Sequence, residues 1–174
     1  MKAFFHLSFI LLFVFTACTS APKQTTTDYT QYVNPFIGTD FTGNTYPGAQ
    51  APFGMVQLSP DNGLPGWDRI SGYFYPDSTI AGFSHTHLSG TGAGDLYDIS
   101  FMPVTLPYKE AEAPLGVYSK FSHQDESATA GYYQVLLKDY GINVELTATE
   151  RCGIQRYTFP EAKAAIFLNL KKAM

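Results

Sequence analysis

The alternation of apolar and polar residues late in the chain constrains the fold more than any other feature. Stretches 133–138 and 143–149 place an apolar side chain at every second position, which is the pattern of a strand with one face in a core. Between them, Asp139-Tyr140-Gly141 supplies a turn in which glycine readily takes a positive φ. The sequence therefore predicts a β-hairpin over residues 132–149. Its apolar positions are Tyr133, Val135, Leu137, Val144, Leu146 and Ala148.

Further strands are expected on both sides of this hairpin. Gly153 to Phe159 is a third strand that ends before Pro160, and the continuous apolar run Ala164 to Leu170 is typical of a strand buried on both faces. A buried strand so close to the end of the sequence leaves its neighbours with open edges, which we interpret as truncation. Earlier, glycine and proline recur every few residues, so short strands joined by long loops are expected. These are Met55–Leu58, Gly72–Tyr75, Ile80–Phe83 and Ile99–Met102.

The composition narrows the class of protein. Of 174 residues, 15 are glycine and 11 are proline, while 16% are aromatic and only 15% are charged. These values exclude a coiled coil, a disordered acidic chain and a helical bundle rich in Glu and Lys. The net charge of −4 supplies no broad cationic surface, so no nucleic-acid partner is expected. The pattern is that of an all-β chain, either one domain or a piece of a larger protein.

The first residues are those of an exported protein. Lys2 precedes an uncharged apolar run from Phe4 to Ala17, which is shorter than the ~20 residues of a membrane-spanning helix. Residues 1–17 are therefore predicted to be a signal peptide. Cys18 ends a Phe-Thr-Ala-Cys stretch that resembles the lipobox of bacterial lipoproteins, in which the cysteine is acylated. Phe15 stands where leucine is usual, so cleavage without a lipid stays an alternative to the lipid anchor on Cys18 that we favour.

This anchor divides the sequence into parts. Residues 18–28 are polar and are expected to tether the lipid to a domain formed by residues 29–174. No acidic run follows Cys18, so the tether does not resemble the surface-export tag of Bacteroidetes lipoproteins. We expect an outer-membrane lipoprotein, attached to the membrane through its lipid and facing either the periplasm or the cell surface.

One loop combines groups that suit a sugar. Residues 61–69 place the only tryptophan, Trp67, between glycines, prolines and charged side chains. The apolar C–H face of a pyranose lies well against an indole, while its hydroxyls need acceptors such as Asp68 and Asn62 and a donor such as Arg69. The alternative is that Trp67 plugs the loop onto the core and that Asp68 and Arg69 form a solvated ion pair.

The triplet His85-Thr86-His87 has the spacing at which two side chains on a strand point the same way. A zinc site there needs a further ligand, and the candidates His123, Asp95 and Asp98 stand at no diagnostic spacing. We therefore favour histidines that bind loops or a ligand hydroxyl over a metal site, and assign no metal ligand.

The glycine-rich stretch that follows the triplet, residues 89–95, lacks the Gly-Lys-Ser/Thr ending of a phosphate loop. Its glycines allow tight turns and a close approach to a ligand or a neighbouring domain. Asp95 and Asp98 are candidate oxygen ligands for a hard cation such as Ca²⁺, although two loop carboxylates are more often cap and turn residues.

Several blocks together resemble the N-terminal domain of glycoside hydrolase family 92, and they cover nearly all of the chain from Tyr29 onward. The resemblance implies an antiparallel β-sandwich of the supersandwich type with long Gly/Pro/aromatic loops, followed in the family by a C-terminal (α/α)₆ barrel. It also implies an exported, calcium-dependent, inverting exo-α-mannosidase that acts on mannose-containing glycans, with N-glycan and yeast mannan both open. The blocks are residues 32–39, 43–49, 52–61, 82–92 and 131–151.

The resemblance further implies where the chemistry lies. An inverting glycosidase needs two carboxyl groups about 6.5–9.5 Å apart, and in this family both, with most Ca²⁺ ligands, belong to the barrel. We therefore expect an N-terminal fragment that is inactive alone and contributes only to substrate binding, and we assign no catalytic residue. The expected substrate-binding residues are Trp67, Asp68, His85, His87, Ser89 and Thr91.

Two other classes of function stay open at this point. The first is a free-standing carbohydrate-binding lipoprotein that holds glycans with Trp67 and the surrounding loops. The second is a small metal-dependent hydrolase built on His85, His87 and Asp95.

Overall fold

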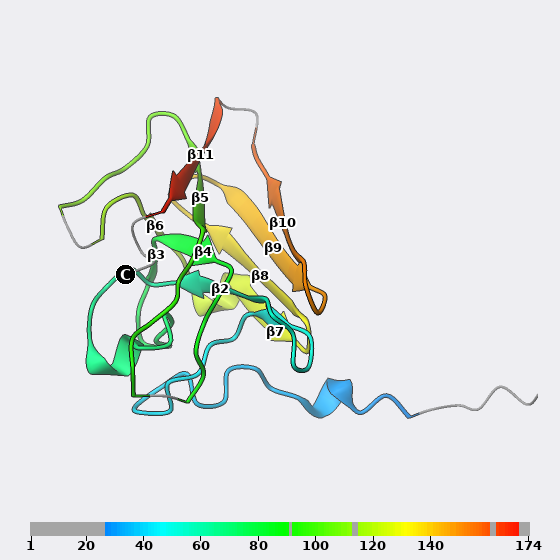
Figure 1. Ribbon diagram of the computed structural model, residues 1–174. Helices are drawn as coiled ribbons and strands as arrows, with labels where there is room; N and C mark the ends of the chain where they lie inside the picture. Colours follow the sequence, from blue (N-terminus) through cyan, green and yellow to red (C-terminus); the bar gives the residue numbers. More distant parts are fainter. Residues whose placement is uncertain (1–26, 91, 113–114, 161–162, 171–174) are drawn as a thin grey trace, which may run out of the picture.

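The computed structural model describes residues 27–90, 92–112, 115–160 and 163–170 (Figure 1). Within these residues every strand pairing is antiparallel and the only helical elements are three short 3₁₀ turns. No helix in this part of the chain has the length and apolar composition needed to cross a bilayer. The predicted signal peptide and Cys18 lie outside the described residues, as does most of the tether. The 3₁₀ turns are η1 Thr30–Tyr32, η2 Trp67–Arg69 and η3 His123–Asp125.

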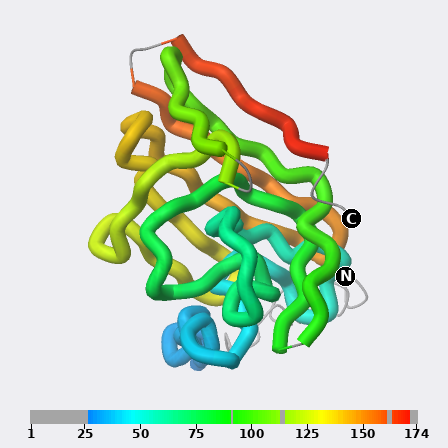
Figure 2. Tube along the Cα trace, turned by 90° about the vertical axis from the view of Figure 1, so that its left-hand side faces the viewer, coloured from blue at the N-terminus to red at the C-terminus, as the bar shows by residue number. Residues whose placement is uncertain are grey.

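Two larger sheets and one small one make up the fold. The first sheet has the order β1-β2-β4-β5-β11, the second has the order β10-β9-β8-β7, and β3 pairs with β6. Figures 1 and 2 show the two larger sheets as separate layers, with the loops of the N-terminal half gathered at one end. The strands are β1 Ala49–Gln50, β2 Gln57–Asp61, β3 Thr79–Ile80, β4 Gly82–Ser84, β5 Ser100–Thr105, β6 Ser119–Lys120, β7 Glu126–Thr129, β8 Tyr132–Leu137, β9 Ile142–Ala148, β10 Gly153–Thr158 and β11 Ala164–Asn169.

The predicted hairpin is confirmed. Strands β8 and β9 pair from Tyr132 opposite Thr147 to Leu137 opposite Ile142. Gly141 in the turn has φ 64°, a left-handed conformation that glycine adopts without the steric cost other residues pay. The third strand is confirmed as β10, which pairs with β9 along its whole length.

The core lies between the two larger sheets. Leu58 and Phe83 from the first sheet are fully buried in one cluster with Tyr133, Val135 and Val144 from the second. Burying a large apolar side chain stabilises a fold by roughly 1.5–3 kcal/mol relative to leaving it exposed. These layers make the all-β antiparallel sandwich that was expected, and they hold the ends of β2, β4 and β5 in fixed positions.

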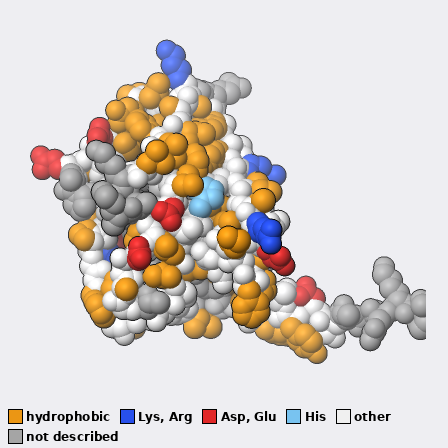
Figure 3. All heavy atoms as spheres, in the orientation of Figure 1, with side chains coloured by type: hydrophobic (Ala, Val, Ile, Leu, Met, Phe, Trp, Pro, Cys, Tyr) orange, Lys and Arg blue, Asp and Glu red, His pale blue; other side chains and the backbone are white. Residues whose placement is uncertain are grey.

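The prediction that residues 164–170 form a strand buried on both faces is wrong for this structure. Strand β11 pairs only with β5, at the edge of the first sheet, and Ile166 and Leu168 are each 51% exposed. Figure 2 shows it as the red outer strand, and Figure 3 shows apolar side chains gathered on the surface in this region. A continuous apolar run does not distinguish a central strand from an edge strand whose second face is open.

The short strands of the N-terminal half were only partly predicted. Expected strands at 55–58, 80–83 and 99–102 correspond to β2, to β3 with β4, and to β5. The strand expected at 72–75 is absent from the structure, because Gly72 has φ 87° and leads into a loop. Tyr73 in that loop is nevertheless fully buried, so its apolar character reflects core packing without a strand.

Candidate functional site

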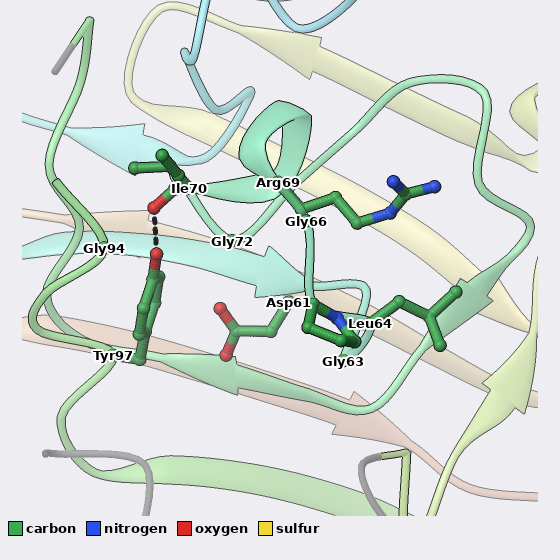
Figure 4. Close-up of a pocket in the computed structure, with 10 residues that line it drawn as sticks. Asp61, Gly63, Leu64, Gly66, Arg69, Ile70, Gly72, Gly94 and Tyr97 are labelled. Carbon is green, nitrogen blue, oxygen red and sulfur yellow. Dashed lines mark hydrogen bonds between the residues drawn. The ribbon is translucent and has the colours of Figure 1, made fainter. Parts of the chain in front are cut away.

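A pocket of about 460 Å³ lies beyond the end of β2 (Figure 4). Asp61, the last residue of β2, contributes its carboxylate, and two loops form the walls: residues 62–72 after β2 and residues 92–99 before β5. The volume falls within the range of about 300–1,000 Å³ that is usual for small-molecule sites. The lining residues are Asp61, Gly63, Leu64, Pro65, Gly66, Arg69, Ile70, Gly72, Gly94 and Tyr97.

Asn62 fastens the first of these loops to the fold. Its Nδ2 donates to the carbonyl of Thr79 at 2.7 Å, and its Oδ1 accepts from the amide of Phe74 at 2.5 Å. The backbone amide of Asn62 also donates to the carbonyl of Gly72 at 2.8 Å, which closes the loop. Asn62 is fully buried, so the expectation that it accepts a hydrogen bond from a sugar is wrong: its side chain is committed to the protein.

Trp67 stands beside the pocket on the short turn η2. Its side chain is 62% exposed, and a Cβ placed on Gly92 would lie 3.1 Å from the indole Cη2. The indole therefore rests against the glycine-rich loop and leaves most of its surface to solvent. The interpretation of Trp67 as a plug packed on the core is wrong, since a plug of this size is normally buried.

The alternative of an ion pair between Asp68 and Arg69 is wrong, because Arg69 pairs with Asp77. Arg69 Nε donates to Asp77 Oδ2 at 2.7 Å and Arg69 Nη2 to Asp77 Oδ1 at 2.6 Å. The guanidinium also lies 4.6 Å from the centre of the Phe74 ring. Asp77 raises the pKa of Arg69 through this hydrogen bond. The bidentate pair fixes Arg69 in the pocket wall, while Asp68 stays half-buried next to Trp67.

His87 lies behind the pocket rather than in it. Its Nδ1 is 2.7 Å from the carbonyl of Gln57, and its Nε2 is 3.0 Å from Asp61 Oδ1 and 3.1 Å from Ser84 Oγ. The side chain of His87 is fully buried and that of Asp61 is 4% exposed. His87 is therefore held between the backbone of β2 and the Asp61 carboxyl group.

His85 lies in a different place. Its Nδ1 is 2.9 Å from the carbonyl of Ile99, and its ring meets Phe101 edge-on. It borders a separate hollow of about 240 Å³ lined also by Gln155, Tyr157 and Ile166. The prediction that both imidazoles point into one site is wrong, because β4 ends at Ser84 and the triplet does not continue its alternation.

The carboxylates of the second loop accept hydrogen bonds from the protein. Asp95 Oδ1 accepts from the amide of Leu96 at 2.8 Å, and Asp98 Oδ2 accepts from Thr86 Oγ1 at 2.9 Å. In the described part of the chain, no three His, Cys, Asp or Glu side chains converge on a metal-sized site. His123, the other zinc candidate, is bound to Glu126 and to the carbonyl of Tyr75.

The last two predicted substrate-binding residues follow His87 in the chain. Ser89 is exposed, and the amide of the next residue, Gly90, donates to the carbonyl of Asn44 at 2.6 Å. Thr91 lies outside the described residues. None of the predicted residues that the structure describes is in the pocket lining: Trp67 and Asp68 lie on η2 between the lining residues Gly66 and Arg69, and His87 lies behind Asp61.

Asp61 and Tyr97 line the pocket, and neither was among the predicted site residues. Leu96, Tyr97 and Ile99 all have positive φ, a conformation that costs non-glycine residues of order 1–3 kcal/mol and often marks a functional site. The hydroxyl of Tyr97 donates to the carbonyl of Ile70, which joins the two loops. Burial raises the pKa of Tyr97 to about 12, with smaller contributions from the charges of Asp61 and Asp95.

Comparison with known proteins identifies the family. The family model named "Glycosyl hydrolase family 92 N-terminal domain" matches residues 32–174. The chain therefore belongs to glycosyl hydrolase family 92, and the matched region is the N-terminal domain of that family.

Solved structures share both the sequence and the fold. A family 92 α-mannosidase from Bacteroides thetaiotaomicron, in complex with mannoimidazole, is 47% identical with a TM-score of 0.76, and the match covers 81% of this chain and 19% of that one. An inverting family 92 mannosidase from the same organism is 32% identical with a TM-score of 0.67, over 84% and 20% of the two chains.

A curated relative is also described as a glycosidase. An uncharacterized secreted glycosidase of Arthroderma benhamiae is 29% identical over 147 residues, which are 79% of this chain and 18% of the relative. The chain thus spans about a fifth of the length of these relatives.

Proposed function

We propose that this chain is the N-terminal domain of an exported, inverting α-mannosidase and supplies one wall of its active site. Membership of family 92 and the similarity to an α-mannosidase in complex with mannoimidazole support the reaction class. The observation that carries the proposal is the exposed Trp67 beside a pocket built from two loops of the sandwich. A large exposed aromatic ring beside a pocket with a few polar groups suits a pyranose, which has an apolar C–H face and hydroxyl groups.

We propose that the two catalytic carboxyl groups lie in another domain of the same enzyme. Inversion needs a carboxylic acid that protonates the leaving oxygen and a carboxylate base that activates water on the opposite face of the sugar. In the described residues, Asp95 accepts from the amide of Leu96, Asp98 accepts from Thr86, and Asp61 is paired with His87. As the family resemblance implies, we assign both catalytic carboxyl groups to a C-terminal (α/α)₆ barrel.

Calcium is assigned mainly to that second domain as well. Carboxylate and carbonyl oxygens are the ligands Ca²⁺ takes, but no three acidic or histidine side chains of the described residues converge on one site. When bound, Ca²⁺ would supply a positive charge that orients sugar hydroxyls. The contribution proposed for the residues of this domain is to bind and orient the sugar.

The proposed location is the cell envelope. A signal peptide at residues 1–17 and acylation of Cys18 would anchor the domain to the outer membrane, and the description of the Arthroderma relative as secreted supports export. The alternative of a free-standing sugar-binding lipoprotein is not favoured, since the match is to one domain of a glycosidase family. The metal-dependent hydrolase is not favoured because His85 and His87 do not share a site.

A joined protein tests this proposal. The chain would be fused in frame to the helical domain of the similar Bacteroides α-mannosidase and assayed with an aryl α-mannoside and Ca²⁺. We expect turnover by the joined protein and none by the 174-residue chain or by the helical domain alone. The proposal is contradicted if a folded joined protein is inactive, or if this chain alone has a turnover that a substitution within it abolishes.

A further inference from the structure

Strand β11 is the outermost strand of the first sheet. It pairs with β5 along its whole length, and no other strand of the described residues lies beside it, as Figure 2 shows. We propose that the open edge of β11 is an interaction surface for a second copy of this chain, and that two β11 strands pair antiparallel about a two-fold axis at Ile166. Identical surfaces related by a two-fold axis form a closed dimer.

The backbone of β11 presents hydrogen-bonding groups at this edge. Just before the strand, the amide of Leu106 donates to the carbonyl of Lys163 at 2.9 Å. Hydrogen-bonded and non-hydrogen-bonded pairs alternate along an antiparallel ladder, so the odd-numbered residues of β11 bond to β5. Pro103, which has no N–H, lies opposite Ile166 in agreement with this pattern. The N–H and C=O groups that point toward the open edge are therefore those of Ala164, Ile166 and Leu168.

The side chains at the edge are apolar. Ile166 and Leu168 share one face of the strand and are each 51% exposed. Pairing centred on Ile166 places this residue opposite its own copy and Leu168 opposite Ala164. On the other face, Phe167 comes to lie opposite Ala165. The pairing thus buries apolar surface of both copies without setting two of the largest side chains against each other.

The charges favour a second copy of this chain as the partner. Residues 164–169 contain no charge and no proline, which are features that usually protect an exposed edge from pairing with another strand. In the register centred on Ile166, Lys163 falls opposite position 169 and meets no like charge. In the flanking sequence, Glu161 stands as far before Ile166 as Lys171 stands after it. The same register therefore aligns positions of opposite charge at both ends of the paired strands.

Two hollows border β11. One, of about 240 Å³, is lined by Phe101, Tyr157 and Ile166 among others. The other, of about 620 Å³, includes Met102 and Phe167 in its lining. Both linings are mainly apolar, so a second apolar strand at this edge would remove more apolar surface from water than the strand contact alone.

Sedimentation of the 174-residue chain over a range of concentrations tests for the dimer. We expect a monomer–dimer equilibrium in the wild type. Ile166→Lys would set two lysines directly opposite each other at the two-fold axis and should weaken dimerisation by about tenfold or more. Ile154→Lys changes an isoleucine of similar exposure on β10. It is the matched control and should leave the dissociation constant of the dimer unchanged.

Amide hydrogen exchange locates the contact. The N–H groups of Ile166 and Leu168 should exchange more slowly as the dimer forms, because the second copy gives them an acceptor. Those of Ala165 and Phe167 bond to β5 and should be protected at every concentration. In a sample that mixes isotope-labelled and unlabelled copies, the methyl groups of Leu168 should give NOEs to the methyl group of Ala164 in the other copy.

A wild-type chain that is monomeric at every concentration would overturn the inference. A dimer that Ile166→Lys leaves intact, or that Ile154→Lys disrupts equally, would do the same. If the Ile166 and Leu168 amides are protected only in the joined protein, the edge belongs to the rest of a longer polypeptide and a second copy is excluded. If Ile166→Lys fails to fold, amide exchange in the wild type decides. None of these results affects the proposed function, which is tested by turnover of the joined protein.

Discussion

The imidazole of His123 stacks on the ring of Tyr75, with the ring centres 4.0 Å apart and the planes 9° apart. The same imidazole places Nδ1 2.6 Å from Glu126 Oε2 and Nε2 2.7 Å from the carbonyl of Tyr75. Glu126 also accepts hydrogen bonds from the hydroxyls of Tyr73 and Tyr133. This carboxylate therefore connects the loop that follows the pocket to strands β7 and β8.

Glu126→Gln should destabilise the domain by about 1–3 kcal/mol, because a buried hydrogen-bond network loses its charged acceptor and some donors are left without a partner. Urea unfolding of both proteins measures the difference. Asp125→Asn, at the neighbouring position with a half-exposed carboxylate, is the control and should change the free energy of unfolding little. An equally small effect for Glu126→Gln would contradict the assigned role of this carboxylate.

Alkaline pH should destabilise the fold. Burial raises the pKa of Tyr46 and of Tyr97 to about 12, and it raises the pKa of Tyr73 and Tyr133 well above the ordinary value, with help from the Glu126 charge. An unfolded tyrosine titrates near pH 10, so the stabilisation is complete below about pH 10 and declines as the pH rises toward the folded-state values. The free energy of unfolding as a function of pH should show this decline, and Tyr46→Phe should make it shallower. A free energy of unfolding that stays constant up to about pH 11 would contradict the expected loss of stability.

Arg156 should control the titration of Glu145 on the neighbouring strand. Hydrogen bonds from Arg156 and then from Tyr132 lower the pKa of Glu145 to about 2. In Arg156→Ala the pKa should return toward the ordinary 4.5, as measured by NMR of the carboxyl carbon. In the wild type, the stabilisation from this lowered pKa is present above about pH 4.5 and is lost as the pH falls toward 2. If the pKa of Glu145 stayed near 2 in Arg156→Ala, a group other than Arg156 would be the cause of the lowered pKa.

The sequence predicted the parts of the fold that local patterns encode. The period-two alternation around Tyr133 and Val144 specified the hairpin, since its strands are joined by a short turn and have one buried face. The exposure of Ile166 and Leu168 on β11 was not predictable in the same way. It depends on which strands lie beside β11, and that is a property of the sheet and not of the local sequence.

The same distinction applies to the site. Trp67 is exposed, as a sugar-contacting aromatic in a Gly/Pro loop would be, and its role in substrate binding stays a prediction. The partner of Arg69 is Asp77 and not the adjacent Asp68, and His85 and His87 diverge although they are two residues apart. Both outcomes are set by backbone geometry that arises only when the loops meet, so the sequence pattern did not specify them.

The most direct test of the central claim is the value of kcat/KM for an α-mannoside in the joined protein with Trp67 replaced. Loss of an indole face against a pyranose removes about 0.5–1.5 kcal/mol or more, so Trp67→Ala should lower kcat/KM about tenfold. Trp67→Phe should recover part of the loss, and Tyr29→Ala, which removes an exposed ring at the start of the domain, should have no effect. If Trp67→Ala retained the full kcat/KM, this domain would not form a wall of the active site.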